Sequence, residues 1–177
     1  TRTQLDYKLS TDGLALRFNY LHIIIFEKFI LNLKDLDKRY SSVQIKKASN
    51  LYKKMKSTDI KNMKLSIMGG LPASETKYSI NKFKNMLDAY KYLNDIDLKA
   101  NLSEFIKEIM PVAEENNVKM GIHPDDPPIP LFGVPRIVSS LQDYEHIFNS
   151  YKSDTNGMTF CSGSLASNFN NNIYKIF

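Results

Sequence analysis

Tryptophan is absent from this 177-residue chain, and cysteine occurs only once, as Cys161. A single cysteine excludes an intrachain disulfide and fits a reducing compartment, so we expect a cytoplasmic protein. No internal repeat or low-complexity linker divides the sequence. With 42% hydrophobic residues, the chain has enough apolar material for one domain with a core, and we predict that residues 1–177 form a single domain.

The sequence also lacks a hydrophobic run long enough to cross a membrane. The most apolar stretch, Tyr20 to Leu31, has about a dozen residues, whereas a spanning helix needs about 20. Three polar residues interrupt it: His22, Glu27 and Lys28. The N-terminal residues show neither an initiator methionine nor a signal peptide, which indicates a chain that begins within a longer protein. We predict a buried helix at Tyr20 to Leu31 and no membrane association.

A strong excess of one charge is missing as well. Lysine and arginine total 24 against 19 acidic residues, a net charge of +5, and the two signs are interspersed. The lysines of one predicted helix share a face that we interpret as solvated: Lys46, Lys47, Lys53, Lys54 and Lys56. We therefore expect no nucleic-acid partner. A non-catalytic basic binding module that uses Lys46 to Lys56 is the alternative from a different functional class.

The first part of the chain predicts a small β-hairpin followed by helices. Alternating residues at Leu5–Leu9 and Leu14–Phe18 flank a turn, and its Asp12-Gly13 pair predicts positive φ at the glycine. Apolar residues at helical spacing then predict helices over about 43–55, 57–68, 79–93 and 102–113. Ser79 is an expected N-cap, Gly69-Gly70 an expected C-cap, and Pro111 should kink its helix.

The clearest strand precedes a proline-rich loop. Side chains alternate from Val118 to His123, and Val118, Met120 and Ile122 form the phase that should face covering helices. Four prolines between Pro124 and Pro130 fix φ and remove amide donors, so the loop is stiff. A stiff loop can hold the histidine at the strand end in one place.

A second unit of the same kind follows. We predict a helix from about Leu141 to Tyr151, with Ser140 and Asp143 at capping-box spacing. A turn at Asn156-Gly157 should then lead into a strand at Met158 to Cys161, with Met158 and Phe160 facing the helices. Two successive strand–loop–helix units indicate parallel strands, and function in such folds gathers at their C-terminal ends.

The same phase directs His123 and Cys161 to one side of these strands, at the same level, where they could share a metal ion. A nucleophilic cysteine–histidine pair is the competing chemistry, and a buried cysteine beside a structural histidine is the plain alternative. Backbone amides of Ser162–Ser164 could bind a carboxylate or simply cap a helix. Asp125 and Asp126 could be acid–base groups or could organise the loop.

Three segments of the sequence resemble the signature of the mannonate dehydratase family: His123–Pro128, Phe132–Val138 and Asn156–Ser164. Other segments resemble the family in the same order: Thr1–Thr3, Ala15–Phe18, Gly70–Pro72 with Glu75, and Pro111–Glu115. The similarity therefore covers nearly the whole chain. It is weaker at Ala73 and Ala166, where the family tends to have glycine, and in the polar run Asn168–Asn172.

The resemblance implies an α/β fold of the (β/α)8 TIM-type barrel, xylose-isomerase-like, with a small β-hairpin insertion and several helices. It also implies a divalent metal, Mn²⁺ or Fe²⁺, with His123 and Cys161 as two of its ligands. The family's other ligands, a histidine and an aspartate, would lie beyond Phe177. Because a barrel needs about 250 residues, we expect residues 1–177 to form one partial barrel domain without its N- and C-terminal segments, inactive alone.

The family converts D-mannonate to 2-keto-3-deoxy-D-gluconate by loss of water, in hexuronate catabolism, so the expected partner is a small sugar acid. Arg136 is a plausible clamp for its carboxylate, Arg2 is a weaker candidate, and structural salt bridges are the alternative for both. Ser162 and Ser164 are further candidates for substrate binding, whereas the general acid and base stay unassigned. A full-length member could be a homo-oligomer. Another metal-dependent sugar isomerase or epimerase barrel is the alternative enzyme.

Overall fold

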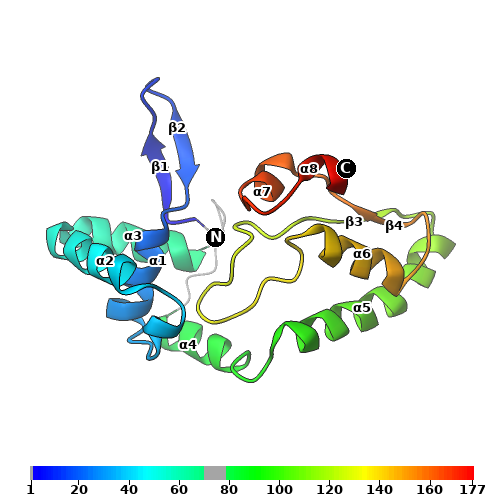
Figure 1. The fold of residues 1–177 in the computed structure, drawn as a ribbon, viewed down its shortest axis with the longest axis horizontal. Helices are drawn as coiled ribbons and strands as arrows, with labels where there is room; N and C mark the ends of the chain where they lie inside the picture. Colours follow the sequence, from blue (N-terminus) through cyan, green and yellow to red (C-terminus); the bar gives the residue numbers. More distant parts are fainter. Residues whose placement is uncertain (1, 70–78) are drawn as a thin grey trace. The chain divides into compact units, whose positions relative to one another are not determined.

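The computed structural model describes residues 2–69 and 79–177 and divides the chain into two units, residues 1–89 and 90–177. The described part of the first unit contains β1 (Gln4–Lys8), β2 (Leu14–Arg17), α1 (Tyr20–Ile25), a π-helix (Phe26–Ile30), a 3-10 turn (Leu36–Lys38), α2 (Ser42–Lys54), α3 (Ser57–Gly69) and α4 (Ile80–Asp88) (Figure 1). The second contains α5 (Asp95–Glu115), β3 (Met120–Ile122), α6 (Leu141–Ser150), β4 (Asn156–Met158), α7 (Ser162–Ala166) and α8 (Ile173–Ile176).

This mixed α/β content agrees with the predicted class, although the strands are few. That residues 1–177 form one domain stays a prediction. The loop segments at Gly70–Pro72, Ala73 and Glu75, with their predicted family likeness, lie outside the described residues.

The β-hairpin is confirmed, because β1 and β2 pair antiparallel and extend away from the helices of their own unit (Figure 1). Its turn differs from the prediction: positive φ falls on Asp12, at 62°, and not on Gly13. The amide of Leu9 donates to the carbonyl of Gly13, at 2.8 Å, which leaves a three-residue loop. The third residue of such a loop is the left-handed one, and aspartate tolerates that conformation.

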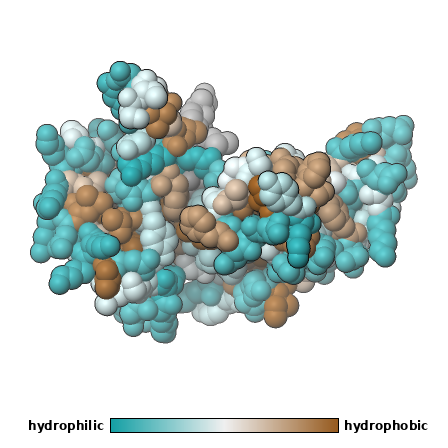
Figure 2. Space-filling model, turned by 45° about the horizontal axis from the view of Figure 1, so that its top comes forward, coloured by the Kyte–Doolittle hydropathy of each residue, from teal (hydrophilic) through white to brown (hydrophobic). Residues whose placement is uncertain are grey.

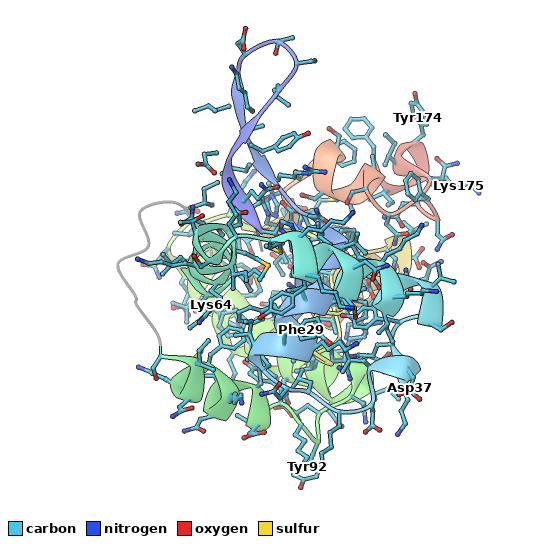
Figure 3. The ribbon with its side chains drawn as sticks, turned by 90° about the vertical axis from the view of Figure 1, so that its left-hand side faces the viewer. Phe29, Asp37, Lys64, Tyr92, Tyr174 and Lys175 are labelled. Atoms are coloured by element: carbon cyan, nitrogen blue, oxygen red, sulfur yellow. The ribbon has the colours of Figure 1, made fainter. Side chains whose placement is uncertain are left out.

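The predicted buried helix forms the centre of the first unit. Ile23, Ile24, Ile25 and Phe26 are 0% exposed, in α1 and the start of the π-helix. Around them lie other buried side chains: Leu31, Tyr40, Ala48, Met63 and Ile67. Phe29, labelled in Figure 3, stacks on Tyr52 of α2 with ring centroids 4.2 Å apart. The lysine face of α2 is exposed, as predicted.

One charged group lies inside this core. Glu27 is 0% exposed, and its carboxylate accepts hydrogen bonds from Arg39 Nε (3.2 Å) and Nη2 (2.8 Å) and from the Tyr40 hydroxyl (2.7 Å). Burying a carboxylate costs free energy unless a positive charge and donors compensate it, and both are present here. We call these three residues the Glu27 cluster.

The end of α4 and the start of α5 differ from the sequence prediction. Helix α4 begins after Ser79, whose side chain accepts from the Lys82 amide as predicted, but ends at Asp88 and not near Leu93. A capping box at Asn94 then starts α5, so the two apolar stripes lie on separate helices. Helix α5 continues past Pro111 to Glu115, and a kink there stays a prediction. Helix α3 includes Gly69, whereas Gly70 lies outside the described residues.

In the second unit, β3 and β4 pair parallel, with Met120, Gly121 and Ile122 opposite Asn156, Gly157 and Met158. Helix α6 connects them, which confirms the predicted parallel strand–helix–strand unit. The boundaries of the second strand were predicted wrongly, because Asn156 and Gly157 belong to β4 and not to a turn. The Asn156 side-chain amide donates to the carbonyls of Ile147 and Tyr151, both at 2.9 Å, which holds this polar residue in the strand, while its Oδ1 atom is buried without a hydrogen-bond partner.

The core of the second unit lies between its helices and these strands. It contains Val138 and residues of all four helices: Ile106, Met110, Ala113, Tyr144, Ile147, Leu165 and Ile176. Met120, Ile122 and Met158 pack against it, so the predicted strand phase is confirmed for them. Val118 and Phe160 are 48% and 38% exposed, contrary to the prediction, because strand pairing does not reach them.

Helix α6 has the predicted N-cap, since the Ser140 side chain accepts from the Asp143 amide at 3.3 Å. The Asp143 carboxylate instead accepts from the Ser139 amide and pairs with Lys99 of α5, at 2.8 Å and 2.7 Å. This carboxylate therefore joins two helices and does not complete a capping box.

Hydrophilic residues cover much of the face shown in Figure 2, between separate hydrophobic patches. Tyr174 on α8, labelled in Figure 3, is 90% exposed. Among residues 2–69 and 79–177, no helix has the length and apolar character that spanning a membrane requires.

Candidate functional site

His123 directly follows β3, the position expected from the sequence. Its Nδ1 atom lies 2.7 Å from the carbonyl oxygen of Pro124. A carbonyl only accepts hydrogen bonds, so Nδ1 carries the proton in the neutral ring, and the lone pair is on Nε2. The ring is therefore oriented as a metal-binding histidine often is, with one nitrogen bonded to the backbone and the other available.

Cys161 lies three residues after β4 and is the N-cap residue of α7. Its sulfur is 3.2 Å from the Ser164 hydroxyl. Ser164 lowers the pKa of the thiol, first through its hydroxyl and then through its backbone amide, while the His123 imidazole adds to the lowering. His123 and Cys161 follow two adjacent parallel strands, and the imidazole is near enough to affect the pKa of the thiol; a shared metal ion stays a prediction. The two residues are not at the predicted equal level, since pairing ends with Ile122 opposite Met158, one residue before His123 and three residues before Cys161.

Asp125, in the loop after His123, binds the segment that precedes α6. One carboxylate oxygen, Oδ2, accepts from the amides of Ile137 (3.0 Å) and Val138 (2.9 Å). The other, Oδ1, accepts from Arg136 Nη1 at 3.3 Å. Of the two roles considered for Asp125, the contacts fit loop organisation. We call Asp125, Arg136 and the two amides the Asp125 cluster.

The residues predicted to bind substrate differ in their contacts, exposure and position in the chain. Arg136 is ion-paired to Asp125, and its Nε is buried without a hydrogen-bond partner. Ser164 is buried with its hydroxyl directed to Cys161, whereas Ser162 is exposed at the start of α7. Arg2 precedes β1 in the first unit. Substrate binding by these four residues stays a prediction.

Sequence reasoning missed Tyr144 as part of this region. It is 1% exposed, and its hydroxyl donates to the carbonyl of Ile122 at 3.3 Å, next to His123. Burial raises the pKa of Tyr144 to about 12, and the charges of Asp125, Cys161 and Asp143 contribute. The sequence pattern places Tyr144 only within the helix predicted from about Leu141 to Tyr151. Its hydroxyl was the signal that could have found it, because a buried tyrosine normally hydrogen-bonds a polar partner, here at the end of β3.

Comparison with known proteins identifies the family. A family model described as D-mannonate dehydratase (UxuA) matches residues 1–177. The chain belongs to the D-mannonate dehydratase family. Mannonate dehydratases from Marinomonas sp. and Brucella canis are 37% and 38% identical to it over 173 and 176 residues. These matches cover 98% and 99% of this chain but 44% of each relative, so the chain spans less than half of their length.

A solved structure gives the same family. The mannonate dehydratase from Streptococcus suis serotype 2 is 29% identical, with a TM-score of 0.62. The similarity covers 99% of this chain and 36% of that one.

For this member of the D-mannonate dehydratase family, the donor set fits part of a metal site. An imidazole nitrogen and a thiolate sulfur are ligands that divalent first-row metals accept. Within the described ranges, no group of three or more histidine, cysteine, aspartate or glutamate side chains could hold a metal ion. His123 and Cys161 therefore offer two ligands, fewer than a metal centre usually takes from its protein.

Proposed function

We propose that this chain takes part in the dehydration of D-mannonate to 2-keto-3-deoxy-D-gluconate, as a carbon–oxygen lyase of hexuronate catabolism. The observation that carries the proposal is the His123–Cys161 pair beyond the ends of two adjacent parallel strands, in a chain whose whole length matches the family. In this reaction the carbon beside the carboxylate loses a proton and its neighbour loses a hydroxyl, and the resulting enol becomes the keto acid.

His123 Nε2 and Cys161 Sγ would hold a divalent cation, Mn²⁺ or Fe²⁺. When bound, such a cation stabilises the negative charge that develops beside the substrate carboxylate. Two protein donors leave it under-coordinated, so its remaining ligands should come from outside the described residues. The hydrogen bond from Nδ1 to Pro124 keeps the ring oriented for this role.

Arg136 is the residue we assign to the substrate carboxylate, because its side chain is 29% exposed and its guanidinium offers a fork of donors. Ser162, Ser164 and Arg2 are secondary candidates. The general acid and base are not assigned to any residue.

The finer architectural predictions belong to the same proposal. These are a partial (β/α)8 barrel over residues 1–177, a cytoplasmic location, and a homo-oligomer in the full-length enzyme. The parallel β3–α6–β4 unit supports the barrel, since such units are what a barrel repeats. A small sugar acid is the expected partner.

The decisive experiment measures manganese content and D-mannonate turnover. His123→Ala and Cys161→Ser should each reduce bound Mn²⁺, both in this chain and in a version extended to the length of its relatives. The extended version should dehydrate D-mannonate, whereas the 177 residues alone should not. Glu145→Gln, an exposed change on α6, is the control.

Appreciable turnover by the 177 residues alone would reject the claim that further segments are needed. Unchanged manganese content in both variants would reject the ligand roles. Bound metal without mannonate turnover in the extended version would favour another sugar isomerase or epimerase.

A further inference from the structure

One peptide group links the candidate metal ligand to the far end of the proline-rich loop. The Pro124 carbonyl accepts the hydrogen bond from His123 Nδ1 at 2.7 Å. The N–H of the same peptide group belongs to Asp125 and donates to the Val138 carbonyl at 2.8 Å. The orientation of the imidazole therefore depends on a peptide plane that the segment before α6 holds from the other side.

The Asp125 side chain strengthens this attachment. Its Oδ2 accepts from the Ile137 and Val138 amides, with the Ser139 hydroxyl more distant at 3.5 Å. Together with its own amide, Asp125 makes three short bonds to two consecutive residues. Its side chain is only 20% exposed, so water competes weakly for these bonds.

We propose that Asp125 is a positioning residue of the candidate site, which fixes the peptide group that orients the His123 imidazole and holds Arg136 beside the same loop. The inference rests on the proposed function, because it takes His123 as a metal ligand. It adds a role for a carboxylate that touches neither metal nor substrate.

The two carboxylate oxygens allow the two effects of Asp125 to be separated. Oδ2 accepts hydrogen bonds from the Ile137 and Val138 amides, and Oδ1 accepts one from Arg136. The Asp125→Asn variant could keep an oxygen toward the amides while losing the charge that attracts Arg136. Alanine loses both, so positioning of His123 should survive Asp125→Asn and fail in Asp125→Ala.

The first test uses Co²⁺ alone as the metal probe on this chain, followed by the thiolate-to-cobalt absorption band. Asp125→Ala should weaken Co²⁺ binding by about 10- to 100-fold, the usual effect of losing a group that orients a ligand. Asp125→Asn should stay within about fivefold, since a partly exposed ion pair is worth about 0–1 kcal/mol. Glu145→Gln removes the same charge from the exposed face of α6 and should change nothing.

Two failures are distinguishable in this test. Absence of the thiolate band both in the unmodified chain and in the version extended to the length of its relatives would overturn the ligand role of Cys161 in the proposed function, and this inference with it. A normal band in the unmodified chain, with equal affinity in Asp125→Ala, would overturn the inference alone. An Asp125→Asn variant as weak as the alanine variant would show that charge, and not the amide contacts, positions the ring.

A second measurement needs neither metal nor a folded alanine variant. Nitrogen-15 spectra of the imidazole should show the Nδ1–H tautomer for neutral His123, both in the unmodified chain and in Asp125→Asn. Dominance of the Nε2–H tautomer in either would overturn the inference.

Discussion

Each unit contains a carboxylate, an arginine and a tyrosine close together, but the two groups differ in exposure. Glu27 is 0% exposed, and its carboxylate accepts hydrogen bonds from the Arg39 and Tyr40 side chains. Asp125 is 20% exposed, and it uses one oxygen for backbone amides and the other for a longer contact with Arg136. Tyr144 donates to a strand-end carbonyl and not to Asp125.

The difference is between a carboxylate held by side chains in a core and one held mainly by backbone amides of a loop. The described partners of Glu27 are the side chains of Arg39 and Tyr40, and its burial suits a group that holds a core together. The Asp125 contacts reach across a loop to the strand end that carries His123. Each of the following variants changes one member of this comparison.

The largest expected effect is in the Glu27 cluster. Glu27→Ala leaves Arg39 as a partly buried charge without its partner, so the free energy of unfolding should fall by about 3–5 kcal/mol. Urea denaturation followed by circular dichroism measures this. Asp37→Ala, an exposed change in the same unit, is the control. A loss below about 1 kcal/mol would show that Glu27 is as weakly coupled as a surface residue.

A smaller pair of effects should distinguish the tyrosines. Tyr40→Phe removes a buried 2.7 Å hydrogen bond to a carboxylate and should cost about 1.5–3 kcal/mol of stability. Tyr144→Phe removes a 3.3 Å bond to a neutral carbonyl and should cost about 0.5–1.5 kcal/mol. The same denaturation experiment compares them. Equal losses of unfolding free energy in the two variants would contradict the distinction between a hydrogen bond to a buried carboxylate and one to a neutral carbonyl.

The smallest effect appears only at high pH. Burial raises the pKa of Tyr144 to about 12, above the value near 10 of an exposed tyrosine. Its protonated form is therefore favoured in the folded state, so this contribution to stability is complete below pH of about 10 and is lost as pH rises toward 12. The difference in phenolate absorbance between the native chain and Tyr144→Phe should show this titration. A midpoint near 10 would mean that the hydroxyl is solvated.

Residue patterns predicted most helices and the position of His123 because they depend on local spacing. The alternation from Val118 to His123 located β3, and Ser79 and Ser140 marked two helix starts. The Asn156-Gly157 pair misled the prediction, since its turn preference was overridden by hydrogen bonds to the end of α6. Local preference predicts a conformation only where no distant group supplies a better partner.

The sequence alone determined the family and the strand that precedes His123. Tertiary structure decided how Cys161 relates to His123, because strand pairing ends at Met158 and the cysteine is the N-cap residue of α7. It also decided the role of Asp125, whose partners lie 11 to 13 residues away. No spacing rule predicts such contacts, since they form only when a loop closes on itself.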